Sequence, residues 1–267
     1  MKKFIVIGNP IEHSLSPKLH NYWFNKYDLI DHTYEKRKIE EGDLKKIIEE
    51  IKNDYLSGIN VTVPFKKMVI PFCDKIDPIA KLTQSVNTVS KKNGKIIGSN
   101  TDYQAFKESI KLIPSKNSVF ILGSGGVTSS ILGAMRDTHQ VFISNRTKRK
   151  AEELKDSFKG TINQIEIIDW GKKPSKKCDV VINTTSIGLK KDDKIDIDFD
   201  DYKGKKISFI DLIYNHKTSF LKEAEKRENH IIDGKSMFLG QAKHAFQIWT
   251  NILPKIDQDT IKLITND

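Results

Sequence analysis

The sequence predicts an α/β fold, organised as one large or two smaller domains, with a Rossmann-like nucleotide-binding unit in mid-chain. Short apolar runs that suit buried strands alternate with segments of helical period along the chain. A glycine-rich turn joins one such run to a helix in mid-chain, and polar clusters follow several of the other runs. This alternation is typical of sheets that bind ligands at their strand ends.

The N-terminal region opens with a strand and a helix. Residues 4–7 are an apolar run, and a helix is expected from Pro17 with Ser16 as its N-cap. Ser14 has no comparable structural role, and two hydroxyls at the start of a helix can together hold a carboxylate. The next expected elements are a strand and an amphipathic helix, at residues 33–39 and 44–51.

The segment 58–66, GINVTVPFK, combines a strand with polar side chains near its end. Its alternating apolar positions are Ile59, Val61 and Val63. Asn60 and Thr62 are therefore expected on the opposite face, and Pro64 ends the ladder. Lys66 then projects near the carboxyl end of a strand, where α/β sheets bind ligands, although a surface lysine is the plainer alternative.

A hairpin and a short polar motif follow. Residues 86–89 read as a strand, and Asn93-Gly94 is a strong hairpin signal before the return strand to Ile97. A helix is expected from Tyr103. Asp102 either caps this helix or meets Lys66, because a carboxylate beside an ammonium orients it for proton transfer.

Residues 118–146 predict a βαβ unit. An apolar run at 119–122 leads into glycines and a helix, and a second strand follows at 141–144. The three glycines are Gly123, Gly125 and Gly126. A plain tight turn would also use glycine, but the strand-to-helix context favours a pyrophosphate at the helix N-terminus. The G-x-G-x-x-G pattern is incomplete, since Thr128 takes its last position.

The residues after the second strand favour NADP over NAD. An NAD site usually carries a carboxylate there for the ribose 2′-OH, whereas this chain has Asn145-Arg146-Thr147 and then three more cations. A 2′-phosphate suits these cations. The alternative is a solvated helix start in a lysine-rich protein.

The remainder repeats the alternation. Expected elements are a helix at 151–158, strands at 165–168, 178–183, 207–210 and 231–232, and helices from Thr218 and from residues 234–242. Gln241 shares the stripe of Met237, Ala245 and Trp249, and a buried amide there needs partners or a ligand.

Composition narrows the class of protein. The 267 residues carry a net charge of +10, but the lysines are scattered, which argues against nucleic-acid binding. Cys73 and Cys178 form neither a disulfide framework nor a metal motif. Because the cysteines lack the spacing of a metal motif, we expect no metal. No signal peptide or membrane segment is evident, so we expect a cytoplasmic protein.

The chain resembles shikimate dehydrogenases over essentially its whole length. The motifs that carry the resemblance, in order, are HSLSP, NVTVPFK, SVNT, NTD, GSGG, NRT, NTTSIG, DLIY and GQAKHAF. The resemblance implies a substrate-binding catalytic domain at 1–103, a Rossmann-like NADP-binding domain at 104–234, and C-terminal helices at 235–267 that pack back on the substrate domain.

The resemblance also implies roles for individual residues. Lys66 and Asp102 would be the catalytic pair. Residues expected to bind or position the substrate are Ser14, Ser16, Asn60, Thr62, Asn87, Tyr214 and Gln241. Residues expected at the cofactor are Gly123, Ser124, Gly125, Gly126, Val127, Asn145, Arg146, Thr147, Lys150, Thr184, Ser186, Leu212, Gly234 and Met237.

The implied activity is reversible, NADPH-dependent reduction of 3-dehydroshikimate to shikimate, by a monomer or homodimer. Departures from the family pattern lie beside the expected site, at Gln84-Ser85, Tyr103 and Gly240, and bear on pocket shape. Two alternatives stay open: a relative that also uses quinate or NAD, and a non-catalytic NADP-binding paralogue.

Overall fold

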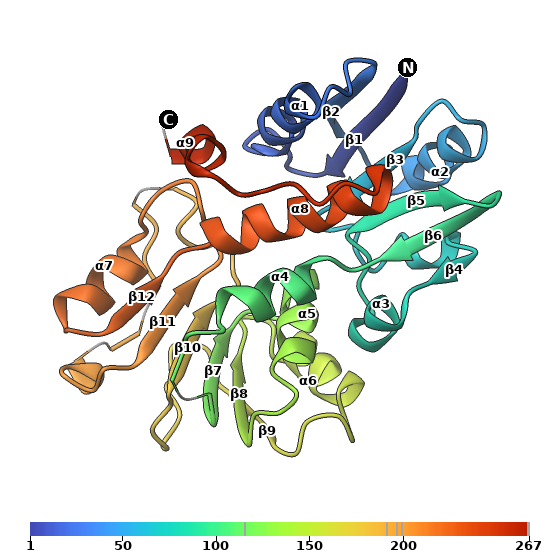
Figure 1. Ribbon diagram of the computed structural model, residues 1–267. Helices are drawn as coiled ribbons and strands as arrows, with labels where there is room; N and C mark the ends of the chain where they lie inside the picture. The colour runs from blue at the N-terminus through green and yellow to red at the C-terminus, as the bar shows by residue number, and fades with distance from the viewer. Residues whose placement is uncertain (115, 191, 196, 199, 266–267) are drawn as a thin grey trace. The chain divides into compact units, whose positions relative to one another are not determined.

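The computed structural model describes residues 1–114, 116–190, 192–195, 197–198 and 200–265, and it divides into two compact units (Figure 1). Unit 1 consists of Met1–Ala105 and Leu239–Asp267, and unit 2 of Phe106–Phe238. The two boundaries fall inside helices α4 (Asp102–Ser109) and α8 (Lys235–Thr250).

Unit 1 contains a mixed sheet with the strand order β2-β1-β3-β5-β6-β4. β1 is parallel to β2 and β3, whereas β5 is antiparallel to β3 and β6. The strands are β1 (Lys2–Gly8), β2 (His32–Lys38), β3 (Gly58–Val61), β4 (Lys75–Ile76), β5 (Thr88–Lys92) and β6 (Lys95–Ser99). Besides parts of α4 and α8, the helices are α1 (Ser16–Lys26), α2 (Leu44–Lys52), α3 (Pro78–Thr83) and α9 (Gln258–Thr265).

The two faces of this sheet bury different side chains, because successive residues of a strand point to opposite sides. One face carries an aliphatic core that joins β1 and β3 to α2 through Ile5, Ile7, Ile59, Val61, Ile47, Ile48 and Ile51. The other face carries an aromatic cluster, contributed by β1, β2, α1 and α8: Phe4, His20, Trp23, Phe24, Tyr34, Phe246 and Trp249.

Unit 2 is a doubly wound parallel sheet with the order β12-β11-β10-β7-β8-β9. Its strands are β7 (Ser118–Leu122), β8 (Gln140–Ser144), β9 (Ile165–Ile168), β10 (Val180–Asn183), β11 (Ser208–Asp211) and β12 (His230–Ile232). Its helices are α5 (Gly126–Ala134), α6 (Lys148–Ser157) and α7 (Ser219–Lys226). Numbered in chain order, these strands lie 6-5-4-1-2-3, the order of a dinucleotide-binding Rossmann fold.

Several local predictions are confirmed and three are wrong. The Asn93-Gly94 turn has positive φ at both residues, 51° and 74°, as a type I′ hairpin requires. Ser16 is the first residue of α1 and not its N-cap, which is Leu15 without a side-chain cap bond. Val63 lies beyond the end of β3 and is 53% exposed, so it is no part of the apolar set.

The third correction concerns β5, which begins at Thr88 and not at Val86. Asn87 therefore lies just outside the ladder, where its backbone carbonyl accepts the Val61 N–H. Within the described ranges, no helix combines the length and apolar character that a membrane crossing requires.

Candidate active site

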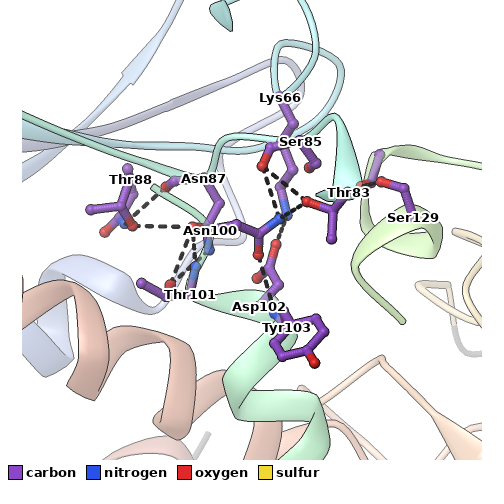
Figure 2. A network of polar contacts seen from close by, with 12 residues as sticks. Lys66, Thr83, Ser85, Asn87, Thr88, Asn100, Thr101, Asp102, Tyr103 and Ser129 are labelled. Atoms are coloured by element: carbon purple, nitrogen blue, oxygen red, sulfur yellow. Dashed lines mark hydrogen bonds and ion pairs between the residues drawn. The ribbon is translucent and has the colours of Figure 1, made fainter. Parts of the chain in front are cut away.

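A buried ion pair is the main chemical feature of unit 1 (Figure 2). The Lys66 Nζ donates to Asp102 Oδ2 at 2.6 Å, and the two side chains are only 9% and 6% exposed. A lysine and an aspartate are rarely buried unless they are paired. The prediction that Asp102 meets Lys66 is therefore confirmed, and Lys66 is no surface lysine.

The turn that carries Lys66 is fixed on both sides. Phe65 and Val69 are buried in the aliphatic core, and the Val69 N–H donates to the Phe65 carbonyl. The Lys66 carbonyl accepts the Val86 N–H at 2.9 Å, which ties the turn to the segment before β5. Lys66 is thus held by backbone packing as well as by Asp102.

Asn100 takes the capping role that Asp102 could have had. Its Oδ1 accepts the Tyr103 N–H at 3.1 Å, and its Nδ2 donates to Thr83 Oγ1 and to the Ser85 carbonyl (Figure 2). Asp102, the first residue of α4, is thereby left to pair with Lys66. The sequence signalled the motif Asn100-Thr101-Asp102, but we assigned no role to Asn100.

Asn87 and Asn60 form a second buried network. Asn87 Oδ1 accepts the Thr101 N–H at 2.8 Å, and its Nδ2 donates to Thr101 Oγ1 at 2.9 Å. Asn60 Nδ2 donates both to the Asn87 carbonyl and to Thr88 Oγ1. Both amide hydrogens of Asn60 are therefore used within the protein, whereas one amide hydrogen of Asn87 has no acceptor among the described residues and can serve a further one.

Four other residues predicted at the substrate, Ser14, Ser16, Thr62 and Gln241, lie in unit 1. Ser14 Oγ accepts the Ser16 N–H at 3.4 Å at the start of α1. Among the described residues, no hydrogen bond joins either serine to the side chains of Lys66, Asp102, Asn60 or Asn87. Thr62 and Gln241 are half-buried, just after β3 and on α8.

The glycine turn of unit 2 lies where the order of its strands reverses. Gly123 follows β7 with a φ of +107°, and a Cβ there would lie 2.5 Å from Thr184 Oγ1, so only glycine fits. Thr184 follows β10, and its hydroxyl bonds the Leu122 carbonyl. Thr128, which replaces the last glycine of the fingerprint, is buried and bonds Thr184 Oγ1 at 2.8 Å.

Two features of this turn suit an anionic group. A Cβ on Gly125, the N-cap of α5, would meet nothing within 4 Å, so the approach to the helix N-terminus is open. The Ser124 hydroxyl is buried and has no hydrogen-bond partner in the described part of the chain. The backbone N–H groups of a helix N-terminus, with an unpartnered hydroxyl of the described residues beside them, fit a pyrophosphate.

Of the four cations at 146–150, two are bonded to carboxylates and two are not paired with a carboxylate of the described residues. Lys148 bonds Asp169 at 3.0 Å, and Arg149 bonds Glu153 at 2.8 Å. Arg146 and Lys150 are exposed, and neither pairs with a carboxylate of the described residues. These two cations are thus the ones available for a phosphate.

A second buried carboxylate, Asp211, was not predicted. Asp211 Oδ1 accepts from Asn183 Nδ2 and the Ile213 N–H, both at 3.1 Å, and Oδ2 accepts from Thr218 Oγ1 at 2.6 Å. Burial raises the pKa of Asp211, while these donors and, more weakly, His216 act in the opposite direction. This network joins the loops after β10 and β11 to the N-terminus of α7, where Thr218 is the N-cap.

The remaining residues predicted at the cofactor also lie in unit 2. Tyr214, predicted at the substrate, stacks on Phe238 with ring centroids 4.2 Å apart. Ser186 is exposed, Leu212 and Val127 are half-buried, and Gly234 and Met237 are buried. Asn145 Nδ2 bonds the Thr147 carbonyl at 2.9 Å.

Two hollows of unit 2 lie away from the strand ends at which ligands of such sheets bind. Hollows of about 530 and 580 Å³ lie in unit 2 beside α6, at the amino ends of β8 and β9. Ligands of parallel α/β sheets bind at the opposite, carboxyl ends. Within the described residues, no group of three or more His, Cys, Asp or Glu side chains is arranged to hold a metal.

Comparison with known proteins gives consistent matches. Residues 6–89 match the family model described as the shikimate dehydrogenase substrate binding domain. A shikimate dehydrogenase (NADP+) of Pelagibacter ubique is 47% identical over 98% of both chains.

Solved structures agree in fold. The shikimate dehydrogenase of Aquifex aeolicus superposes with a TM-score of 0.87 at 35% identity, over 99% of this chain and 96% of that one. The enzyme of Thermus thermophilus in complex with NADP(H) and shikimate gives a TM-score of 0.84 at 28% identity, over 98% and 97% of the two chains.

Proposed function

The chain belongs to the shikimate dehydrogenase family, and from this membership we propose that it catalyses the NADPH-dependent, reversible reduction of 3-dehydroshikimate to shikimate. The observation that carries the proposal is the buried Lys66–Asp102 pair. It lies in the unit that contains the match to a substrate-binding domain. The structure of the Thermus thermophilus enzyme in complex with NADP(H) and shikimate supports the proposal of both ligands.

The reaction needs one proton at the ketone oxygen. When NADPH is bound, its nicotinamide supplies the hydride that reduces the ketone carbon. Lys66 is the proposed proton donor to the oxygen, and in the reverse direction it takes the proton back. Asp102 holds the ammonium in place at 2.6 Å. A positive charge fixed in a buried site stabilises the negative charge that develops on the oxygen.

The substrate carboxylate and hydroxyls have matching groups in unit 1. The two hydroxyls at the start of α1, of Ser14 and Ser16, are proposed to hold the carboxylate, and the cap position of Leu15 leaves Ser16 free for this role. Asn87 is proposed to donate its remaining amide hydrogen to a ring hydroxyl. The other residues proposed for the substrate are Asn60, Thr62 and Gln241 of unit 1 and Tyr214 of unit 2, with Asn60 as a positioning residue for Asn87.

The cofactor is proposed to bind unit 2 at the turn after β7. The open approach at Gly125 and the unpartnered Ser124 hydroxyl suit its pyrophosphate. Arg146 and Lys150 suit the 2′-phosphate, with Asn145 and Thr147 beside them. The residues proposed to complete the cofactor site are Gly123, Gly126, Val127, Thr184, Ser186, Leu212, Gly234 and Met237.

A direct assay tests this function and its alternatives. Purified protein is mixed with shikimate or quinate and with NADP+ or NAD+, and formation of reduced nicotinamide is followed by absorbance. We expect turnover with shikimate and NADP+. Comparable turnover with quinate or NAD+ would be compatible with the proposed roles of Lys66 and Asp102 but would refute the proposed substrate or cofactor specificity. Tight NADP+ binding without any turnover would support a non-catalytic paralogue.

A substitution tests the cofactor preference separately. Arg146→Ala should raise the KM for NADP+ about tenfold, since a bond to a charged group is lost, and leave the KM for NAD+ unchanged. Arg149→Ala is the matched control, because Arg149 is already paired with Glu153. Equal effects of the two substitutions would contradict a 2′-phosphate contact at Arg146.

A further inference from the structure

We propose that Tyr34 is a positioning residue for substrate binding, which acts on Asn87 through Asn60. This inference rests on the proposed function of the Asn87 side chain. Tyr34 lies in β2, at the edge of the unit 1 sheet, and it is 2% exposed. No sequence motif pointed to it.

The contacts form a continuous chain. The Tyr34 hydroxyl donates to Asn60 Oδ1 at 2.6 Å, a short hydrogen bond between buried side chains. The Asn60 amide then donates to the Asn87 carbonyl at 3.1 Å and to Thr88 Oγ1 at 3.0 Å. The hydroxyl therefore holds the Asn60 side chain in the orientation that clamps the backbone of Asn87.

The register of the sheet makes this contact possible. Tyr34 of β2 is paired with Phe4 of β1, and Asn60 of β3 is paired with Val6 of β1. Phe4 and Val6 are two residues apart, so all four side chains share one face of the sheet. A tyrosine can thus reach diagonally across β1 to β3.

The backbone of Tyr34 is fixed as well. Asn21 of α1 donates to the Tyr34 carbonyl at 2.8 Å and accepts the Tyr34 N–H at 2.9 Å. This pair of bonds attaches the edge strand to the helix that begins at Ser16. Tyr34 consequently connects the middle of α1, through Asn21, with the loop before β5. Proposed substrate groups lie at the start of this helix and in this loop.

His20 fixes the plane of the tyrosine ring. The two rings stack with centroids 4.3 Å apart and an angle of 3° between their planes. His20 is completely buried, and neither ring nitrogen has a hydrogen-bond partner among the described residues. Burial lowers the pKa of His20 to about 3, so the ring is neutral. It serves here as a flat, stacked surface.

The position of Trp249 supports the same arrangement. Its indole lies against Gly58 of β3, where a Cβ would collide with the ring. The indole Nε1 donates to the Val89 carbonyl at 3.2 Å. α8, which carries Gln241, is therefore attached to the sheet face on which Tyr34 and Asn60 meet.

The test is Tyr34→Phe, which removes only the hydroxyl and leaves the stack on His20. We expect the KM for shikimate to rise about tenfold, from one lost buried hydrogen bond, with the KM for NADP+ unchanged. Tyr27→Phe is the matched control. Its hydroxyl accepts the Lys255 N–H and does not donate to Asn60, so both KM values should stay near those of the wild type.

A double-mutant cycle tests the route through Asn60. In an Asn60→Ala background, Tyr34→Phe should have no further effect on the KM for shikimate. Additive effects, or equal rises in both KM values, would show that Tyr34 supports only the fold and would overturn the inference. An unchanged KM in Tyr34→Phe with normal wild-type turnover would overturn the inference alone. Absence of wild-type turnover would overturn the proposed function and the inference together.

Discussion

Among the described residues, each unit buries one carboxylate, Asp102 at the start of α4 and Asp211 at the carboxyl end of β11, and the partners of the two differ. Asp102 of unit 1 is paired with the Lys66 ammonium at 2.6 Å. Within the part of the chain that the structure describes, Asp211 of unit 2 accepts hydrogen bonds only from uncharged donors, two side chains and one backbone N–H. One carboxylate is therefore hydrogen-bonded to an ammonium that can give up a proton, whereas the hydrogen bonds of the other come from uncharged groups.

This difference separates chemistry from support. A buried ammonium beside a carboxylate is a positioned acid, and its loss affects a reaction directly. A buried carboxylate that accepts from an amide, a hydroxyl and a backbone N–H holds segments of the chain together. We infer that Asp102 serves the reaction through Lys66, whereas Asp211 fixes the loops that carry Thr184 and Leu212.

The largest expected effect comes from removing the cation of unit 1. Lys66→Ala should lower kcat by about 10²- to 10⁴-fold, the range for a positioned acid–base group. Lys67→Ala is the control, since Lys67 is exposed and adjacent. Steady-state kinetics with shikimate and NADP+ measure both variants. Full turnover in Lys66→Ala would show that Lys66 is not the proton donor, and the assignment of Asp102 to the reaction would be wrong.

Removing a donor from Asp211 should change stability and not chemistry. Thr218→Val leaves one carboxylate oxygen without its 2.6 Å donor and removes the N-cap of α7. We expect a loss of about 2–3 kcal/mol in the free energy of unfolding. Thr218→Ser keeps the hydroxyl and should stay close to the wild type. A fully folded Thr218→Val protein that had lost turnover would place Asp211 in the chemistry.

A smaller effect concerns His20, a buried group of unit 1 with no charged partner among the residues that the structure describes. Its pKa is lowered from 6.5 to about 3 in the folded state, so between these values the unfolded chain binds more protons. Stability should therefore fall as the pH drops through this window, by about 2 kcal/mol between about pH 7 and pH 5. His20→Phe should reduce that slope in denaturant unfolding. Equal slopes would mean that His20 is not buried neutral.

The sequence predicted the features that depend on local pattern. The strand–glycine–helix order located the turn at Gly123, and alternation within β3 placed Asn60 opposite Ile59 and Val61. The pairing of Lys66 with Asp102 was predicted as one of two alternatives. Which alternative holds depends on Asn100, because its side chain caps α4 and leaves Asp102 to bind Lys66. No local sequence pattern tells which of Asn100 and Asp102 is the cap.

The features that were missed depend on contacts between distant segments. Tyr34 and Asn60 are 26 residues apart, and only the register of β2 on β1 and of β1 on β3 brings them together. Asp211 was visible in the motif DLIY, but its two side-chain donors come from Asn183 at the end of β10 and Thr218, the N-cap of α7. The wrong N-cap at Ser16 has another cause, since a serine before proline favours a cap and α1 begins one residue earlier.

One pair of identical substitutions tests the central claim. Asp102→Asn and Asp211→Asn each remove one buried negative charge and nearly preserve shape. Because burial raises the pKa of Asp211, its charged form opposes folding increasingly as the pH rises through that pKa. The neutral amide removes this opposition, so Asp211→Asn should be at least as stable as the wild type at neutral pH.

The measurement is kcat with shikimate and NADP+ for both variants, with the folded fraction checked by thermal unfolding. Asp102→Asn should lose roughly 10²-fold or more, because Lys66 loses its ionic partner, whereas Asp211→Asn should stay within about threefold of the wild type. Equal losses in two folded variants would contradict the division of the buried carboxylates into a chemical and a supporting one.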